Sequence, residues 1–197
     1  MKSEDSCARA RFLVWGARFY PKSCKRDPMD NLTIRRASSS DLKRIVELRL
    51  LLQEHVEKSN PLTWRMTEEG MRLLKQEVEN ELATGNVQVL LAEADGEVIG
   101  FVQGEVTCRS ECMPRTVGHV SLMYVMKRFR RKGVGRRLVT ELFKFFSSNK
   151  AETLTVRYVI GNTEAERFWK KLGFVSIIMT SSTYLKDLGF KLKGIVN

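Results

Sequence analysis

Two periods in the placement of hydrophobic residues divide most of the chain into strands and helices. Alternation of apolar and polar residues is typical of half-buried strands, whereas apolar residues every three or four positions are typical of amphipathic helices. These patterns predict strands over residues 32–35, 87–92, 97–107, 116–126 and 153–159. They predict helices between Leu42 and Pro61 and over residues 67–83, 135–148 and 163–172. One or two closing strands are expected over residues 174–184.

Local signals at the ends of these segments support the assignment. Ser38, with Asp41 three residues later, has the spacing of a capping box before the first helix. Asp95-Gly96 has the composition of a hairpin turn, and Gly85-Asn86 marks a turn after the second helix. The order is then strand, two helices, three strands, helix, strand, helix, strand. We therefore predict a mixed, mostly antiparallel α/β (α+β) sheet with one strand-helix-strand crossover.

The composition is that of an ordinary globular protein. The 197 residues are 43% hydrophobic and 29% charged, which suits one domain whose core needs no disulfides. No apolar stretch approaches the roughly 18 residues of a membrane-spanning helix, and the low Gly and Pro content excludes collagen-like chains. The four cysteines are too few for a secreted disulfide framework, so we expect a cytoplasmic protein. Cys108 and Cys112 lack the further ligands of a zinc site, and we expect no metal.

The first 29 residues show no sustained period. They carry seven Lys or Arg and three Asp or Glu. Their arginines interrupt the apolar core that a signal peptide needs, and Glu4 and Asp5 disfavour a transit peptide. We interpret residues 1–29 as a basic extension before a domain of residues 30–197, with Met29 as a second candidate start. A nucleic-acid-binding arm is the alternative.

The net charge of +11 is concentrated in one turn. Seven basic residues and no acidic ones fall between Lys127 and Arg137. Gly133 and Gly135 let the backbone turn tightly at the start of a predicted helix, where free N–H groups and the helix dipole bind anions. The spacing fits neither a P-loop nor a dinucleotide-binding fingerprint, because Leu138 replaces the third glycine of the latter. The turn predicts a phosphate site, and a basic helix cap without a ligand is the alternative.

Two motifs resemble those of the GNAT superfamily of N-acetyltransferases. Residues 124–135, Tyr-Val-Met-Lys-Arg-Phe-Arg-Arg-Lys-Gly-Val-Gly, resemble its acetyl-coenzyme A signature, with a core of Arg or Gln, two residues, Gly, one residue, and Gly or Ala. Residues 162–174 resemble its Asn-x-x-Ala-x-x-Phe-Tyr-x-Lys-Leu-Gly-Phe segment, with Trp169 in place of Tyr. The resemblance spans roughly residues 32–184. It implies the GNAT fold, with about six or seven strands, about four helices, a splayed strand pair and a glycine turn at the central strand-helix junction.

The resemblance also implies acetyl-coenzyme A (acetyl-CoA) as cosubstrate. In the family the pantetheine arm pairs with the exposed backbone of the strand before the turn, which corresponds here to residues 123–126. The N–H groups of the turn hold the pyrophosphate, and Asn162 approaches the pantetheine, although helix capping alone would explain Asn162. The cofactor-binding residues that we expect are Tyr124, Val125, Met126, Arg130, Arg131, Lys132, Gly133, Val134, Gly135, Arg136 and Asn162.

Direct attack of an amine on the acetyl thioester, which the resemblance implies, needs a base. His119 is the first candidate, because the pKa of a histidine suits proton transfer near neutral pH. Glu105 on the preceding strand is the second, and a purely structural His119 is the alternative. The period of two is expected to place on one face the side chains of His119, Ser121, Met123 and Val125.

The proton donor for the leaving thiolate is not the tyrosine that many relatives use. Trp169 stands in its place, and an indole N–H does not act as an acid near neutral pH. We expect Trp169 to pack in the core, as large aromatic residues on helices do. Tyr184 and Tyr158 are the substitute acids that the sequence offers, with water as the alternative.

The resemblance implies that the chain transfers acetyl from acetyl-CoA to a primary amine, and this is the function that we expect. The acceptor partner is a small molecule or a protein: a protein N-terminus, a lysine, a polyamine or another small amine. The two early helices offer acidic and aromatic side chains to a cation, namely Glu54, His55, Glu57, Trp64, Glu68 and Glu69. A homodimer is compatible with the sequence, and neither a membrane nor nucleic acid is an expected partner. The alternative is a non-catalytic acyl-CoA-binding or ribosome- or nucleic-acid-associated module, which Trp169 favours.

Overall fold

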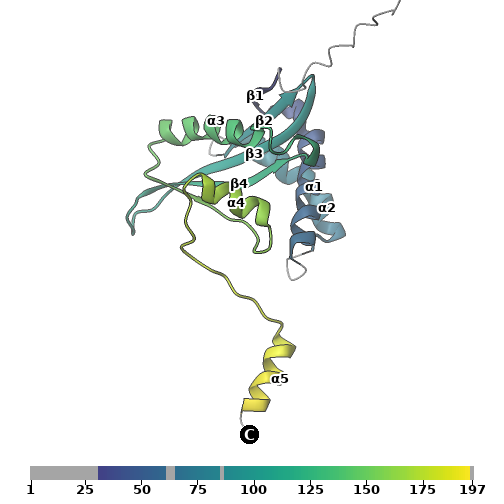
Figure 1. The fold of residues 1–197 in the computed structure, drawn as a ribbon, viewed down its shortest axis with the longest axis vertical. Coiled ribbons are helices and arrows are strands. Elements are labelled where there is room, and N and C mark those ends of the chain that lie inside the picture. Colours follow the sequence, from purple (N-terminus) through teal and green to yellow (C-terminus); the bar gives the residue numbers. More distant parts are fainter. Residues whose placement is uncertain (1–30, 61–64, 85–86, 196–197) are drawn as a thin grey trace, which may run out of the picture.

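The computed structural model describes residues 31–60, 65–84 and 87–195 (Figure 1). The predictions for residues 1–29, for Trp64 and for the Gly85-Asn86 turn lie outside the described residues. The strands are β1 (Thr33–Arg36), β2 (Val87–Ala94), β3 (Glu97–Cys108), β4 (Thr116–Val125) and β5 (Thr153–Val156). The α-helices are α1 (Leu42–Ser59), α2 (Glu68–Ala83), α3 (Val134–Ser148), α4 (Thr163–Lys171) and α5 (Leu185–Ile195). Within the described ranges, no helix is both long and apolar enough to cross a bilayer.

The five strands form one mixed sheet in their order along the sequence. Neighbours from β1 to β4 are antiparallel, and β5 runs parallel to β4. A parallel pair needs a crossover connection, which α3 supplies. Figure 1 shows α1 and α2 on one side of the sheet and α3 and α4 on the other. The predicted mixed α/β fold is confirmed, although the described part of the chain has five strands rather than six or seven.

Each face of the sheet has its own buried cluster. Phe101 of β3 packs with Leu48 of α1 on one face. Val102, the next residue, packs with Leu138 of α3 on the opposite face. Successive side chains of a strand point to opposite faces, so one apolar run serves both clusters. Burial on both faces explains why the middles of β2 and β3 are continuous apolar runs rather than alternating ones.

β4 contains one residue more than the part of β3 that it faces. The register passes from Gln103 opposite Leu122 to Gly104 opposite Val120, which leaves Ser121 without a partner. This extra residue is a β-bulge, which bends its strand and changes which side chains share a face. Sequence periodicity alone did not predict it.

β4 and β5 part at the bulge. Their pairing ends with Val120 opposite Val156, the last residue of β5. The predicted strand over residues 153–159 therefore ends early, while β4 continues to Val125. The expected splayed strand pair is confirmed. We call the edge of β4 over residues 121–125, together with the start of α3, the slot.

Residues 174–184 form no strand, and the prediction of closing strands is wrong. After α4, Phe174 packs on Trp169 with ring centroids 5.2 Å apart, and the chain then runs extended away from the sheet to α5 (Figure 1). No hydrogen bond joins residues 175–183 to the rest of the described chain. A strand needs a neighbouring strand for its backbone groups as well as residues that favour extended backbone, and here that neighbour is missing.

The predicted capping box and hairpin turn are both confirmed. The Arg35 guanidinium donates to both carboxylate oxygens of Asp41 at 2.8 Å, and Ser38 N–H donates to Asp41 Oδ2 at 2.9 Å. These hydrogen bonds, led by those from Arg35, hold the pKa of Asp41 well below its usual range. Asp95 (φ 50°) and Gly96 (φ 78°) form the left-handed turn between β2 and β3.

Candidate active site

The open edge of β4 presents backbone groups that no strand pairs. Met126 N–H donates to the carbonyl of Ile99 in β3 at 2.9 Å. Because alternate residues of a strand direct their N–H and C=O groups to opposite sides, those of Met123 and Val125 point away from β3. This is the side from which β5 has departed. An extended ligand can pair with such an edge as an added strand would.

The slot leads into the N-terminus of α3. The first intrahelical bond of α3 runs from Arg137 N–H to the carbonyl of Gly133 over 3.1 Å. The preceding N–H groups of the first turn have no intrahelical acceptor, and they are those of Val134, Gly135 and Arg136. These groups and the positive end of the helix dipole form an anion site.

The two glycines of this turn serve different purposes. Gly133 adopts φ 83° in open space, so its backbone conformation requires glycine. A Cβ on Gly135 would lie 2.8 Å from Cε of Met123 and 3.3 Å from Cε2 of Phe168. Gly135 therefore lets the first turn of α3 pack closely against β4 and α4.

The side chain of Arg130 ties the turn to the end of β4. Its Nε donates to the carbonyl of Val125 at 2.9 Å, and its guanidinium forms an ion pair with Glu164 in the first turn of α4. The guanidinium carbon also lies 5.4 Å from the ring centre of Tyr124. The sequence analysis assigned Arg130 to cofactor binding and did not predict these contacts. Four other basic side chains of the turn are exposed and form no ion pair with the described residues, namely Arg131, Lys132, Arg136 and Arg137.

His119 lies at the closed end of the slot, where β4 still pairs with β5. Its cross-strand partners are Glu105 of β3 and Thr155 of β5, so the three side chains form a row on one face. Nδ1 of His119 is 2.9 Å from Oγ1 of Thr155. Because the Thr155 hydroxyl donates to the Gly118 carbonyl (3.4 Å), it accepts from Nδ1–H, which leaves Nε2 of the neutral ring as an acceptor.

The electrostatic surroundings favour a neutral His119. Partial burial lowers its pKa, and the nearby positive charge of Arg157 lowers it further, while Glu105 acts in the opposite direction. Sequence reasoning placed His119 on the same face as Met123 and Val125, and this is wrong. The bulge at Ser121 shifts the alternation of side chains along β4 by one position. Met123 and Val125 therefore face the buried cluster on the side of α3 and α4, whereas His119 faces the side of α1 and α2.

Comparison with known proteins identifies the family. The model of the acetyltransferase (GNAT) domain matches residues 62–187, well over half of the chain. The chain belongs to the GNAT acetyltransferase family. An uncharacterized N-acetyltransferase of Bacillus subtilis, YhfO, is 28% identical over 143 residues, which cover 73% of this chain and 89% of YhfO. An N-alpha-acetyltransferase of Sulfurisphaera tokodaii is 30% identical over 93 residues, 44% of this chain and 56% of that protein.

Solved structures share the fold of this GNAT protein. The tetramutant of the BH1408 protein from Bacillus halodurans has a TM-score of 0.70 at 18% identity, over 78% of this chain and 99% of that one. The aminoglycoside N-acetyltransferase AAC(6′)-Iy in complex with CoA has a TM-score of 0.61 at 18% identity, over 78% and 93%. The expected acyltransferase class is thus confirmed, and at these identities the solved structures support the fold alone.

Two other residues from the family motifs have structural contacts in this acetyltransferase. Oδ1 of Asn162 accepts the N–H of Ala165 at 3.1 Å, so Asn162 caps α4. Its amide NH2 has no partner among the described residues. Trp169 is only 4% exposed and packs edge-on against Phe168 and Phe174. This confirms the expectation that Trp169 is a core residue.

The structure does not bring the two candidate acids to the same place. Tyr184 is 60% exposed and lies immediately before α5, on the segment that leaves the body (Figure 1). Tyr158 lies two residues after the end of β5 and packs against the buried cluster on the side of α3 and α4. Tyr184 is therefore remote from the slot in this structure, and Tyr158 is the tyrosine that the splayed strands carry toward it.

Sequence reasoning missed a buried polar network beside the His119 row. Arg49 of α1 is 5% exposed and donates hydrogen bonds to Glu81 of α2 and to Gln103 of β3. Gln103 also donates to Glu81 at 3.1 Å. The carbonyl of Gln103 accepts the hydroxyl of the bulged Ser121 at 3.4 Å. The network thus connects both early helices to the bulge, and an arginine within an apolar helical face was its sequence signal.

The loop after β5 closes against the end of α1. Asn60 Nδ2 donates to the carbonyl of Ile160 at 3.2 Å. Gly161 (φ 98°) lies so close to the Ser59 carbonyl oxygen that a Cβ would overlap it. The end of α1 is therefore held beside the splayed strands.

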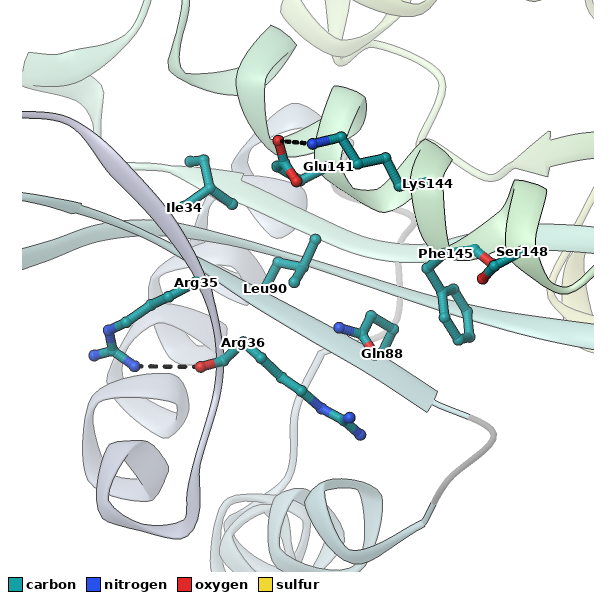
Figure 2. Close-up of a pocket in the computed structure, with 9 residues that line it drawn as sticks. All are labelled: Ile34, Arg35, Arg36, Gln88, Leu90, Glu141, Lys144, Phe145 and Ser148. Atoms are coloured by element: carbon teal, nitrogen blue, oxygen red, sulfur yellow. Dashed lines mark hydrogen bonds and ion pairs between the residues drawn. The ribbon is translucent and has the colours of Figure 1, made fainter.

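A hollow of about 450 Å³ lies elsewhere, where β1 and β2 meet α3 (Figure 2). Ile34, Leu90 and Phe145 line it together with the charged Arg36 and Lys144. None of the residues that line it belongs to the slot or to the His119 row. We therefore assign the chemistry to the slot, which the backbone groups define, rather than to this open hollow.

Proposed function

We propose that this GNAT protein transfers the acetyl group of acetyl-CoA to a primary amine. One observation carries the proposal: the unpaired edge of β4 leads directly to the unpaired N–H groups at the start of α3. An edge for an extended amide-containing arm beside a site for a pyrophosphate matches the chemistry of coenzyme A. The CoA in the complex of AAC(6′)-Iy, which shares the fold, supports the same cosubstrate.

The residues of the slot would divide the binding of acetyl-CoA among them. Met123 would pair with the pantetheine arm through its backbone, the N–H of Val125 would face the thioester, and the NH2 group of Asn162 would donate to the arm. The turn from Arg131 to Arg136 would bind the pyrophosphate. Exposed arginine and lysine side chains of the turn would pair with the phosphates. Arg130 would hold the turn in place through Val125 and Glu164 rather than bind phosphate itself.

We propose His119 as the base and Glu105 as the carboxylate that attracts the cationic amine. The amine loses a proton to Nε2 of His119, directly or through water, and its nitrogen then attacks the thioester carbon. The carbon–sulfur bond breaks and the thiolate takes up a proton, for which Tyr158 and water are the candidates. The N–H of Val125 is the candidate donor to the oxyanion.

The acceptor is proposed to enter between the end of α1 and the slot. Among the acidic residues of this region, Glu54 and Glu69 form ion pairs with Lys58 and Arg72 on their own helices. Glu57 accepts the N–H of Met66 at 3.0 Å. These contacts leave Glu105 as the carboxylate best placed for the amine. The relatives include an N-alpha-acetyltransferase and aminoglycoside acetyltransferases, so we propose a protein N-terminus and a small polyamine as the first acceptors to test.

We keep residues 1–29 as a basic extension, residues 30–197 as the catalytic domain and a cytoplasmic location as proposals. The alternative of a non-catalytic binding module has lost its main support. It rested on Trp169 in the position of a tyrosine, and the burial of Trp169 between Phe168 and Phe174 explains that residue by packing.

Calorimetry with acetyl-CoA, followed by an acceptor screen with detection of free thiol, tests the proposal. We expect micromolar binding of acetyl-CoA and thiol release with at least one amine. Gly133→Val should abolish binding, because a β-branched residue does not adopt φ 83° without strain. Gly96→Val, which places the same strain in a remote turn at φ 78°, is the matched control. Absence of binding by the folded protein would overturn the assignment.

A further inference from the structure

Two opposite charges flank His119 on the side of the sheet that faces α1 and α2. Glu105 of β3 is its direct cross-strand partner. Arg157 comes directly after the last residue of β5, and alternation along the chain puts its side chain on the same side as that of Thr155. Glu105 raises the pKa of His119 and Arg157 lowers it, so both charges lie within electrostatic reach of the imidazole.

Neither of these two side chains has a partner of its own. Within the part of the chain that the structure describes, the side chains of Glu105 and Arg157 form no ion pair and no hydrogen bond, with each other or with a third group. The nearby Arg49, in contrast, is held by Glu81 and Gln103. Glu105 is half-buried and Arg157 is exposed. One charge of each sign is therefore available to a ligand that reaches His119.

The spacing of the two charges suits a ligand that carries both. Neighbouring strands lie about 4.8 Å apart, so the backbones of Glu105 on β3 and Thr155 on β5 are about 10 Å apart, with β4 between them. Arg157 is two residues beyond Thr155 in the direction of the slot, because β5 runs parallel to β4. His119 therefore lies between an anionic group on one side and a cationic group on the other.

The pair of charges distinguishes between classes of amine. An acceptor with positive charges alone, such as a polyamine, is attracted by Glu105 and repelled by Arg157. An acceptor with a carboxylate beside its amine is attracted by both. The planar guanidinium of an arginine also matches a carboxylate with two parallel N–H donors, which gives a strong and specific contact. The arrangement therefore favours a zwitterion over a polycation.

We propose that the acceptor carries a carboxylate close to its amine, and that Arg157 binds this carboxylate and so selects the acceptor; this inference rests on the proposed function. Glu105 receives the ammonium group, Arg157 binds the carboxylate, and His119 lies between them as the base. Two sources supply this chemistry, namely a free α-amino acid and a polypeptide N-terminus followed by an acidic side chain. The inference narrows the range of acceptors and ranks a polyamine last.

Matched acceptors that differ only in the carboxylate test this inference. Each common α-amino acid is compared with the amine that lacks only its carboxylate, for example phenylalanine with 2-phenylethylamine and lysine with cadaverine. Wild type should show the higher kcat/KM with the amino acid, and Arg157→Ala should lower the ratio of the two kcat/KM values by about tenfold. Arg157→Glu should invert the preference. Because each ratio compares two acceptors on one protein, an effect of the substitution on His119 itself cancels.

Arg167→Ala is the matched control. Arg167 is also exposed and forms no ion pair with the described residues, but it lies on α4, on the opposite side of the sheet (Figure 1). Its removal should leave the ratio at the wild-type value. Peptides that begin with Ser-Glu and Ser-Gln distinguish the two sources of the carboxylate. A preference for Ser-Glu that Arg157→Ala removes assigns the carboxylate to a polypeptide, and a preference confined to free amino acids assigns it to a small molecule.

Binding measured without turnover separates this inference from the proposed function. Calorimetry of the same acceptor pairs, with and without CoA, measures the site directly. Tighter binding of the amino acid by wild type than by Arg157→Ala supports the inference, and if no acetyl is then transferred, the proposed function alone fails. Acetyl transfer with the same ratio in wild type and Arg157→Ala would overturn the inference and leave the proposed function standing. A folded protein that neither binds nor acetylates any carboxylate-bearing amine would also overturn it.

Discussion

Nδ1 of His119 and Oγ1 of Thr155 lie 2.9 Å apart, so a side-chain hydrogen bond joins β4 to β5 just before the two strands part. The contact fixes the imidazole at the closed end of the slot. It also directs the free ring nitrogen away from Thr155. A candidate base with a fixed tautomer at this junction allows the acid–base assignment to be tested by pH.

Because the pKa of His119 is lowered, the neutral base persists below the ordinary histidine value of about 6.5. The rate of acetyl transfer, expressed as kcat/KM, should therefore fall only when the pH drops below that value. His119→Asn should lower kcat/KM by about 10²–10⁴-fold and remove this fall in rate at low pH. Thr155→Val should cost about fivefold and retain the fall. A pH–rate profile of His119→Asn that superimposes on the wild-type profile would refute the base assignment.

The same lowered pKa affects stability. The unfolded chain binds a proton at His119 more readily than the folded protein, so the free energy of unfolding should decrease as the pH falls through about 6.5. The decrease should end below the lowered folded-state value. Urea unfolding of wild type and His119→Asn at several pH values checks this: the stability of wild type relative to His119→Asn should be lower at pH 5 than at pH 8.

Asp41 provides a second pH dependence with a different range. Its pKa is lowered chiefly by the hydrogen bonds from Arg35, so its contribution is present above the ordinary value of about 3.9 and is lost as the pH falls toward the lowered folded-state pKa. Asp41→Asn should destabilise the protein at pH 7 by about 1 kcal/mol. Thermal unfolding should show the two proteins converging in acid. Equal stability at pH 7 would show that the capping contacts contribute nothing.

Gly161 is predicted to be the least replaceable glycine near the site. Alanine there meets both an unfavourable φ of 98° and the backbone carbonyl of Ser59. Gly96→Ala is the control, because it has φ 78° and open space. We expect Gly96→Ala to cost about 1 kcal/mol and Gly161→Ala to cost at least twice as much. If Gly161→Ala and Gly96→Ala unfold at the same urea concentration, the end of α1 moves aside for the added methyl group without loss of stability.

Trp169 is predicted to matter for stability and not for proton transfer. Trp169→Tyr keeps an aromatic ring in the cluster with Phe168 and Phe174 and should leave kcat within about threefold of wild type. Trp169→Ala should cost about 3–5 kcal/mol in unfolding free energy. A large gain in kcat for Trp169→Tyr would contradict the core assignment and show that a tyrosine acid was missing.

Much of this architecture is readable from local sequence. The helices α1 to α4 and the strands β1 to β5 follow from apolar periodicity, because their side chains pack into a core on the expected faces. Gly133 and Gly135 mark the turn, because the chain needs a left-handed backbone conformation at Gly133 and a close approach of α3 to β4 at Gly135. The motif does not predict the contacts of Arg130 with Val125 and Glu164, because these depend on distances between separate elements.

The failures have a common physical cause. The bulge at Ser121 is a property of two strands paired in register, and neither strand alone specifies it. Residues 174–184 have the composition of a strand, but a ladder needs an edge within reach, which composition does not encode. The network of Arg49, Glu81 and Gln103 likewise joins three elements that are distant in sequence.

The single extra residue at Ser121 changes which residues of β4 face each side of the sheet. Before it, odd-numbered residues such as His119 face the side of α1 and α2; after it, odd-numbered residues such as Met123 face α3. Deleting Ser121 would therefore restore a regular alternation in which every other side chain of β4 keeps its present face, and only the extra residue and its local bend would be lost. A designer who transplants this slot into another sheet must carry the insertion with it, since the insertion bends β4 at the point where β5 stops pairing with it.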